Sequence, residues 1–452
     1  MQKARKTAFD RRHRQTLRFN ISRYDAAVAK GKATYGNLAL AKARAAYIKQ
    51  LTVNNLHDCL LQFEENLTAH GGTVIWAENA TEAIAAILKL LHEHNAHTVV
   101  KSKSMTTEEV DFNEHAATAD IESLETDLGE YIVQLAGEKP YHIVTPAMHK
   151  SKEDIARLFH DKFGTPPDST PETITAFVRQ LLRDKFRHAE VGVTGANFLI
   201  ADSGAIAVTE NEGNALMTVS FPKIHIAVAG IEKVIPSLES LGLLWPLLAV
   251  HGTGQRVTAY NSIISGPRRT DGEAPEVDGP EKMYVILLDN GRSKLYGRLP
   301  QAQALRCIRC GACLNACPIY KNIGGYTYAA TYSGPIGSVI TPFYKGFADY
   351  GHLSFACTVC GRCSEVCPVS LPLHRLLLFN RHDAVEQGTA GRMWGMAMNA
   401  ARYILGKRRR MDRIPGRLKN AAFLAGKNML GARKSMPHFA EHSFSQMWKH
   451  QR

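Results

Sequence analysis

The sequence of 452 residues has no apolar stretch long enough to cross a membrane. The longest candidate, residues 241–250, is about half the length that a transmembrane helix needs, and it contains Pro246. The basic N-terminus leads to the pair Arg11-Arg12, but no apolar run follows the pair. We therefore expect neither a secretory signal nor a twin-arginine signal.

Three common catalytic and nucleotide-binding motifs are also missing. The sequence has no G-x-G-x-x-G fingerprint, no lysine-containing phosphate loop and no G-x-S-x-G elbow. We therefore expect no nicotinamide site, no nucleotide hydrolysis and no serine-hydrolase chemistry of that type.

Cysteine is scarce outside two short motifs. The chain has 9 cysteines, and only Cys59 lies outside the motifs. We expect Cys59 to behave as a small buried apolar residue. Because free thiols last poorly under oxidising conditions, this usage predicts a cytoplasmic protein.

The two motifs repeat the pattern C-x2-C-x2-C-x3-C-P. The first contains Cys307, Cys310, Cys313 and Cys317, and about forty residues later the second contains Cys357, Cys360, Cys363 and Cys367. Three closely spaced thiolates can bind one face of a cubane, whereas the fourth lies too far along the loop and binds the other cluster. The spacing thus predicts two [4Fe–4S] clusters, with the ligand sets Cys307, Cys310, Cys313, Cys367 and Cys357, Cys360, Cys363, Cys317. A pair of zinc ribbons is the alternative, and the proline after each fourth cysteine favours iron–sulfur.

Charge is concentrated at the two ends of the chain. Residues 1–36 carry 10 Lys and Arg against 2 Asp and Glu, and residues 375–452 carry 16 against 4. The basic C-terminal segment could dock on an acidic partner or on an anionic membrane surface near a quinone-linked acceptor. A location peripheral to the inner face of the cytoplasmic membrane is therefore an extension of the cytoplasmic prediction. We expect no nucleic-acid partner, because the basic ends lack interleaved aromatic residues.

Periodicity predicts four parts along the chain. They are an N-terminal helical segment (1–70), an α/β domain (71–292), a mostly helical domain with the cysteine motifs (293–385) and a basic C-terminal segment (386–452). In the second part, apolar strands alternate with helices, which is typical of a parallel sheet. The expected strands are residues 73–77, 97–101, 141–145, 198–201, 205–209, 223–229 and 284–288.

Polar or glycine-bearing segments follow several of these strands, where ligands bind in open α/β sheets. Exposure alone also makes loops polar, so a surface loop is the alternative for each. The residues that we predict for a cofactor or ligand pocket are Lys101, Ser102, Glu125, Asp127, His149, Glu210 and Asn214.

With two cysteine motifs after an α/β domain, the chain resembles the lactate utilisation protein B family. The resemblance covers nearly the whole chain, and the segments that carry it in the α/β part are residues 101–105, 125–130, 142–146, 201–204 and 209–214. It implies a lactate-utilisation (LUD) domain with a sheet similar to those of coenzyme A transferases and sugar-phosphate isomerases, followed by an α-helical ferredoxin domain. It also implies membership of a multi-protein complex that oxidises L-lactate to pyruvate.

From this we expect an electron-relay subunit of such a complex, with other subunits as partners, and not an independent enzyme. Two-electron oxidation of lactate must be matched to clusters that accept one electron at a time. The alternatives are a transferase-like enzyme in the LUD pocket with redox-sensing clusters, and a nucleic-acid-binding protein with structural clusters.

Overall fold

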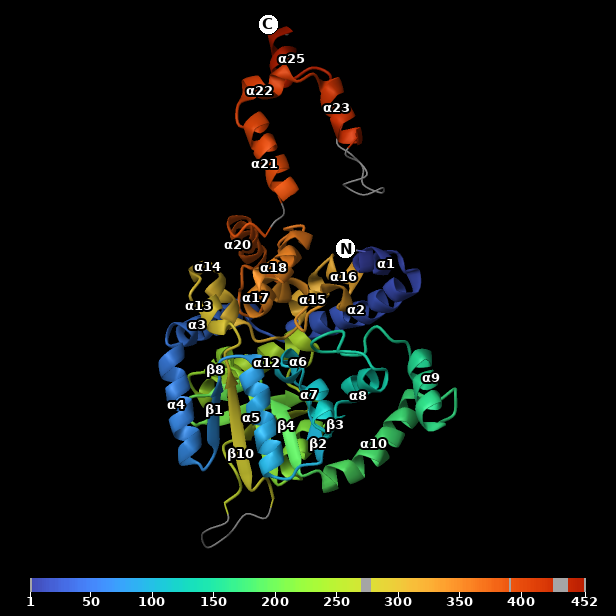
Figure 1. The fold of residues 1–452 in the computed structure, drawn as a ribbon, viewed down its shortest axis with the longest axis vertical. Coiled ribbons are helices and arrows are strands. Elements are labelled where there is room, and N and C mark those ends of the chain that lie inside the picture. The colour runs from blue at the N-terminus through green and yellow to red at the C-terminus, as the bar shows by residue number, and fades with distance from the viewer. Residues whose placement is uncertain (1, 270–277, 390–391, 426–437, 451–452) are drawn as a thin grey trace. The chain divides into compact units, whose positions relative to one another are not determined.

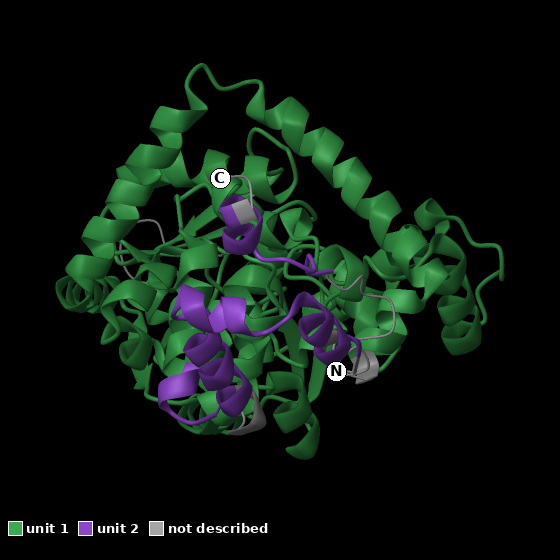
Figure 2. Cartoon of the chain, turned by 90° about the horizontal axis from the view of Figure 1, so that it is seen from above, with its two compact units in different colours: residues 1–383 green, residues 384–452 purple. Residues whose placement is uncertain are grey.

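The computed structural model describes residues 2–269, 278–389, 392–425 and 438–450. The chain divides into two compact units, residues 1–383 and residues 384–452 (Figure 2). Among the helices of the described ranges, none is both long and apolar enough to span a membrane.

The first unit is built on a parallel six-stranded sheet in the order β1-β10-β7-β4-β2-β3 (Figure 1). Its strands are β1 (Thr73–Ala77), β2 (Thr98–Lys101), β3 (Glu122–Glu125), β4 (Val191–Gly195), β7 (Ile224–Gly230) and β10 (Lys282–Leu288). The predicted α/β class is therefore confirmed, and four of these strands coincide with expected ones.

Both faces of this sheet are buried, which explains its nearly continuous apolar strands. In β7, Ile226 and Val228 belong to the core beneath α5 (Ala80–Glu93) and α7 (Phe112–Thr118). The alternate residues Ala227 and Ala229 belong to the core beneath α4 (Leu56–Ala69). Side chains of successive strand residues point to opposite faces, so one strand serves two cores.

A second sheet has the order β8-β5-β6-β9, with β8 (Val234–Ile235), β5 (Phe198–Ile200), β6 (Ala205–Glu210) and β9 (Tyr260–Ile264). The expected strands at residues 198–201 and 205–209 are present as β5 and β6, which pair as an antiparallel hairpin. Its turn ends at Gly204, whose φ of +62° suits glycine.

The expected strand at residues 141–145 is wrong, because this segment is an irregular loop. The Tyr141 hydroxyl shares a hydrogen bond of 2.8 Å with Nε2 of His13, and its ring packs edge-on against Tyr326. The backbone N–H of Tyr141 donates to the carbonyl of Pro146, which closes a turn. Packing against distant elements thus overrides the local β propensity.

Helices make up most of the rest of the first unit. Before and between the strands they are α1 (Gln2–Phe9), α2 (Arg11–Lys32), α3 (Leu38–Asn54), α6 (Met105–Glu109), α8 (Leu128–Leu135), α9 (Lys152–Phe163), α10 (Pro171–His188), α11 (Asn214–Ser220) and α12 (Leu241–Gly252). After the sheet they are α13 (Arg292–Tyr296), α14 (Leu299–Ala302), α15 (Ala312–Ala316), α16 (Tyr320–Ile323), α17 (Gly334–Lys345), α18 (Phe347–Tyr350), α19 (Arg362–Glu365) and α20 (Leu373–Glu386). Short 3₁₀ turns are η1 (Ile231–Lys233), η2 (Leu238–Ser240), η3 (Gln303–Arg306), η4 (Tyr326–Tyr328) and η5 (Gly351–Ala356).

The cysteine-bearing helical region does not form a core of its own. Leu314 and Ile336 from this region share one apolar cluster with Leu17 of α2 and with Leu244 and Leu247 of α12. The helical region is thereby fixed against the loops at one end of the large sheet.

The second unit contains α21 (Arg392–Leu405), α22 (Arg408–Arg413), α23 (Gly416–Ala425) and α25 (Phe444–His450). Several of its large apolar side chains are exposed, including Met396, Tyr403 and Leu418. The Arg410 guanidinium lies 3.7 Å from the centroid of the Tyr403 ring. This unit thus presents basic and apolar groups side by side.

Candidate functional site

The two cysteine loops have the same backbone conformation. In the first, Arg309 and Gly311 have φ of +58° and +76°, and in the second Val359 and Gly361 have φ of +56° and +80°. A β-branched residue such as valine rarely adopts positive φ, so both loops are held in an uncommon shape that recurs at functional sites.

In both loops this shape turns backbone N–H groups toward sulfur. The N–H of Arg309 donates to Sγ of Cys307 at 3.4 Å, and that of Val359 donates to Sγ of Cys357 at 3.2 Å. Hydrogen bonds to thiolate sulfur stabilise its negative charge and tune the reduction potential of a bound cluster. A short helix follows each loop, α15 after the first and α19 after the second, and the two helices pack against each other.

The eight motif cysteines line two small cavities, four in each. One cavity is lined by Cys307, Cys310, Cys313 and Cys367, and the other by Cys317, Cys357, Cys360 and Cys363. Each cavity thus takes three cysteines from one motif and the fourth from the other motif. Four thiols around one small cavity match the donor set of a [4Fe–4S] cluster, so these residues fit the group.

Burial raises the pKa of the Cys363 thiol to about 12 and that of Cys367 to about 11, and nearby cysteine thiolates act in the same direction. Such thiols do not ionise at neutral pH by themselves. Because metal ligands are thiolates, a bound metal would offset this cost of burial.

The two cysteine cavities differ in exposure. Cys310, Cys313 and Cys367 of the first are buried, whereas Cys360 of the second is exposed. The first cavity is therefore an inner site and the second an outer site near the surface of this unit.

A larger cavity of about 350 Å³ lies at the carboxyl ends of the parallel strands. Ser102 follows β2, Asp127 follows β3, and Lys233 follows β7. Arg309 and Cys310 of the first cysteine loop close the same cavity. Because Ile143, Arg309 and Cys310 line both spaces, the large cavity borders directly on the inner cysteine site.

The structure separates the predicted pocket residues into three groups. Ser102, Asp127, Glu210 and Asn214 line the large cavity. Lys101 and Glu125 are buried behind its wall. His149 lies elsewhere, with Nε2 at 2.7 Å from Oε2 of Glu138 and its ring stacked at 4.7 Å on that of Tyr141.

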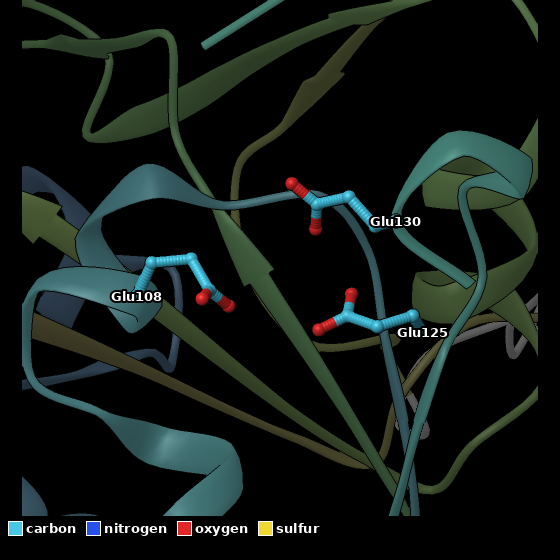
Figure 3. A group of neighbouring side chains, drawn as sticks. All are labelled: Glu108, Glu125 and Glu130. Carbon is cyan, nitrogen blue, oxygen red and sulfur yellow. The ribbon is translucent and has the colours of Figure 1, made fainter. Parts of the chain in front are cut away.

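Lys101 belongs to a buried network with three carboxylates. Its Nζ lies 2.8 Å from Glu125, 3.3 Å from Glu108 and 3.8 Å from Glu130. Figure 3 shows Glu108, Glu125 and Glu130 facing one another from different segments. Such a trio resembles a cation site, but the Lys101 ammonium already lies among the carboxylates. We therefore assign it as an internal ion-pair network.

Protonation in this network is strongly perturbed. Burial opposes the charge on Lys101, but Glu125, Glu108 and Glu130 together raise its pKa. Burial, followed by the Glu125 charge, raises the pKa of Glu130 well above its usual range. Both carboxylate oxygens of Glu130 lack a hydrogen-bond partner in the described part of the chain. The network therefore holds Lys101 charged and favours neutral Glu130.

The three cationic residues that line the large cavity, Lys103, Lys233 and Arg309, are absent from the list of predicted pocket residues, although Lys103 lies in the segment 101–105. Burial lowers the pKa of Lys233 to about 8, and the Arg309 charge acts in the same direction. The sequence did contain a signal for Arg309, because the first cysteine motif has this arginine where the second motif has the apolar Val359. The only sequence signal for Lys233 is that it follows the expected strand at residues 223–229.

Comparisons with known proteins agree with this architecture. The LUD domain family profile matches residues 60–288, and the 4Fe-4S dicluster domain profile matches residues 303–371. The chain is 45% identical over 353 residues to Lactate utilization protein B of Bacillus pumilus, covering 78% of this chain and 73% of that protein. The corresponding protein of Macrococcus caseolyticus is 46% identical over 341 residues, which cover 75% and 70%.

A third relative, named "Uncharacterized electron transport protein YkgF", comes from Escherichia coli. It is 43% identical over 360 residues, covering 80% of this chain and 75% of that protein. A solved DUF162 family protein from Deinococcus radiodurans covers 52% of this chain and 98% of its own, with a TM-score of 0.29 and 15% identity.

Proposed function

This chain belongs to the lactate utilization protein B family, and on that basis we propose that it is an iron–sulfur electron-transfer subunit of a multi-protein complex that oxidises L-lactate to pyruvate. The names of its relatives, which refer to lactate utilization and to electron transport, support the pathway and the type of chemistry. The observation that carries the proposal is the succession of a ligand-sized cavity, an inner cysteine site and an outer cysteine site.

We further propose that the chain holds two clusters. Cys307, Cys310, Cys313 and Cys367 would hold the inner one, and Cys357, Cys360, Cys363 and Cys317 would hold the outer one. The four-cysteine lining of each cavity supports this assignment. When bound, a [4Fe–4S] cluster accepts and releases one electron at a time.

The protein around the cysteines supplies a path with a direction. Arg309 and Cys310 place the inner site at the wall of the large cavity, and exposed Cys360 places the outer site where an external acceptor can approach. Between the sites, buried Tyr328 lies close to Cys313 and to Cys317.

The large cavity also favours a second candidate, a transferase-like enzyme whose clusters sense redox state. The observation in its favour is that polar side chains converge at the strand ends, where α/β enzymes bind substrates. This candidate requires turnover by the isolated chain, whereas a relay requires partner subunits.

The isolated chain is expected not to reduce NAD with L-lactate, because it contains no dinucleotide fingerprint. The same preparation, combined with its co-purified partners, should transfer electrons from L-lactate to an artificial acceptor. Spectrophotometric assays of both preparations test the proposal. Turnover by the isolated chain would favour the enzyme candidate instead.

Anaerobically purified protein is expected to contain about eight iron and about eight sulfide per chain, since two cubanes carry four of each. Metal analysis with sulfide determination measures this. Half that iron would mean a single cluster, and zinc in place of iron would restore the zinc-ribbon alternative.

We also propose that the basic C-terminal unit docks the chain on an acidic partner subunit. Near a surface of opposite charge each Lys or Arg contributes about 1 kcal/mol, and the attraction weakens as salt shortens the screening length. Deleting residues 405–452 is expected to leave iron content unchanged and to abolish salt-sensitive co-purification of the partners. Unchanged co-purification would contradict docking, and loss of sedimentation with anionic vesicles alone would identify a membrane surface instead.

A further inference from the structure

Two of the cationic side chains that line the large cavity, Arg309 and Lys233, are available to a ligand. The Arg309 side chain is only 8% exposed, and its Nε and Nη1 have no acceptor among the described residues. Lys233 is half-buried and lines the same cavity, so its ammonium adds a second positive charge there. Buried donors without partners are costly, so the two free donors of Arg309 at a cavity wall point to a ligand that supplies acceptors.

The position of Arg309 is fixed by its neighbours. Its Nη2 donates to Oε1 of Glu232 at 2.9 Å, and its guanidinium lies 4.5 Å from the centroid of the Tyr332 ring. Glu232 in turn accepts a hydrogen bond from Nε of Arg292. These contacts hold the guanidinium at the cavity wall while its other edge stays free for an acceptor.

The acidic residues of the cavity are already engaged. Asp127 accepts from the N–H of Glu130 at 3.1 Å, and Glu212 accepts from the N–H of Leu128 at 3.1 Å. Glu210 accepts from the N–H of Leu216 at 2.9 Å. Lys103, the third cation, donates to the carbonyl of Val144. Three cations and three carboxylates therefore balance, which suits a ligand with one negative charge better than a multiply charged phosphate.

The size and lining of the cavity restrict the ligand further. Its volume of about 350 Å³ is in the range of sites for medium-sized organic ligands, and a three-carbon acid would leave most of it empty. Ile143, Val144 and Leu248 add an apolar wall beside the cationic one. The ligand should combine one anionic group with an apolar body.

We propose that this cavity binds an organic monocarboxylate larger than lactate, with the carboxylate at Arg309 and Lys233 and the apolar body against Ile143, Val144 and Leu248. Arg309 lies between Cys307 and Cys310 in the chain, so the bound carboxylate would lie beside the inner cysteine site. This assignment goes beyond electron relay and stands whether or not the chain relays electrons.

Calorimetric titration of the cluster-loaded, full-length chain with a series of straight-chain carboxylates tests the proposal. From butyrate to hexanoate, affinity is expected to rise about fourfold per methylene, as for transfer of CH₂ out of water. Hexan-1-ol, which lacks the carboxylate, should bind at least tenfold more weakly than hexanoate. Hexanoate should also alter the paramagnetic spectrum of the inner site and leave that of the outer site unchanged.

The repeated loops provide the key variant. Arg309→Val gives the first loop the residue that the second loop carries at the same position and with the same positive φ, so the loop conformation should persist. We expect full iron content and a loss of hexanoate affinity of tenfold or more, since hydrogen bonds to charged groups have that strength. Lys233→Gln, which lies outside the cysteine motif, should weaken binding in the same way. Arg362→Gln, an exposed arginine of the second motif, should leave binding unchanged.

Three results would overturn the proposal. They are affinity that does not depend on chain length, inorganic phosphate or L-lactate binding more tightly than hexanoate, and wild-type hexanoate affinity in Lys233→Gln. If Arg309→Val lost iron, its cysteine loop would be disturbed, and the hexanoate affinity of Lys233→Gln alone would then decide whether the proposal holds.

Discussion

Replacing Cys317 by Ser is expected to disrupt the outer site, although Cys317 belongs to the first motif in the sequence. Cys317 lines the same cavity as Cys357, Cys360 and Cys363, and the cavity of the inner site is lined by Cys367 in its place. Iron should fall from about eight to about four per chain, because a cubane that loses a thiolate ligand becomes labile. Metal analysis and paramagnetic spectra of the reduced protein measure both effects.

Two further variants complete this test: Cys367→Ser, which removes the corresponding ligand of the inner site, and the control Cys59→Ser. Cys367→Ser should disrupt the inner site and spare the outer one, while Cys59→Ser should change neither, since Cys59 packs against the core around α4. If Cys317→Ser instead removed the signal of the inner site, each motif would bind its own cluster.

Replacing Lys101 by Met is expected to destabilise the folded chain by about 3–5 kcal/mol, because it leaves buried carboxylates without their cation. Lys101 is fully buried, and Glu125 and Glu130 are nearly so. Chemical denaturation of the full-length chain at neutral pH measures the loss. The matched variant Lys89→Met removes an exposed pair with Glu93 and should cost less than about 1 kcal/mol.

Glu130→Gln should restore part of the stability of Lys101→Met. The folded-state pKa of Glu130 is raised, so its contribution is fully present below the unfolded pKa and is lost as pH rises through the folded pKa. Glutamine cannot ionise, and the gain from Glu130→Gln should therefore grow with increasing pH. A gain that was equal in acid and in alkali would argue against neutral Glu130.

Local sequence signals predicted those parts of the fold whose cause is local. The apolar run expected as a strand at residues 223–229 became the buried strand β7. Strand β4 was missed because Val-Gly-Val-Thr-Gly resembles a loop. A Cβ on Gly192 would lie 1.9 Å from the carbonyl oxygen of Thr218, so the glycine permits close packing of α11 on the strand.

In the candidate site, too, local sequence signals predicted residues whose position has a local cause. Ser102 was found because it directly follows the expected strand at residues 97–101, whereas Asp127 comes after β3, which was not among the expected strands. The meeting of Lys233 with Arg309 depends on how a helical region packs on a sheet more than seventy residues away in sequence. No spacing rule encodes such a contact. His149 was predicted for the pocket but does not line it, because the strand expected at residues 141–145 is absent. It pairs with Glu138 outside the cavity.

The unequal burial of the eight motif cysteines predicts the order in which the two cysteine sites are oxidised. Dissolved oxidants attack accessible sulfur first, and Cys360 is the exposed member of the set. A chain handled in air should therefore lose its outer site before its inner one, and under the proposed relay the inner site would then have no route to the surface. Repair of such a chain would need only the surface site to be rebuilt, with the interior left folded.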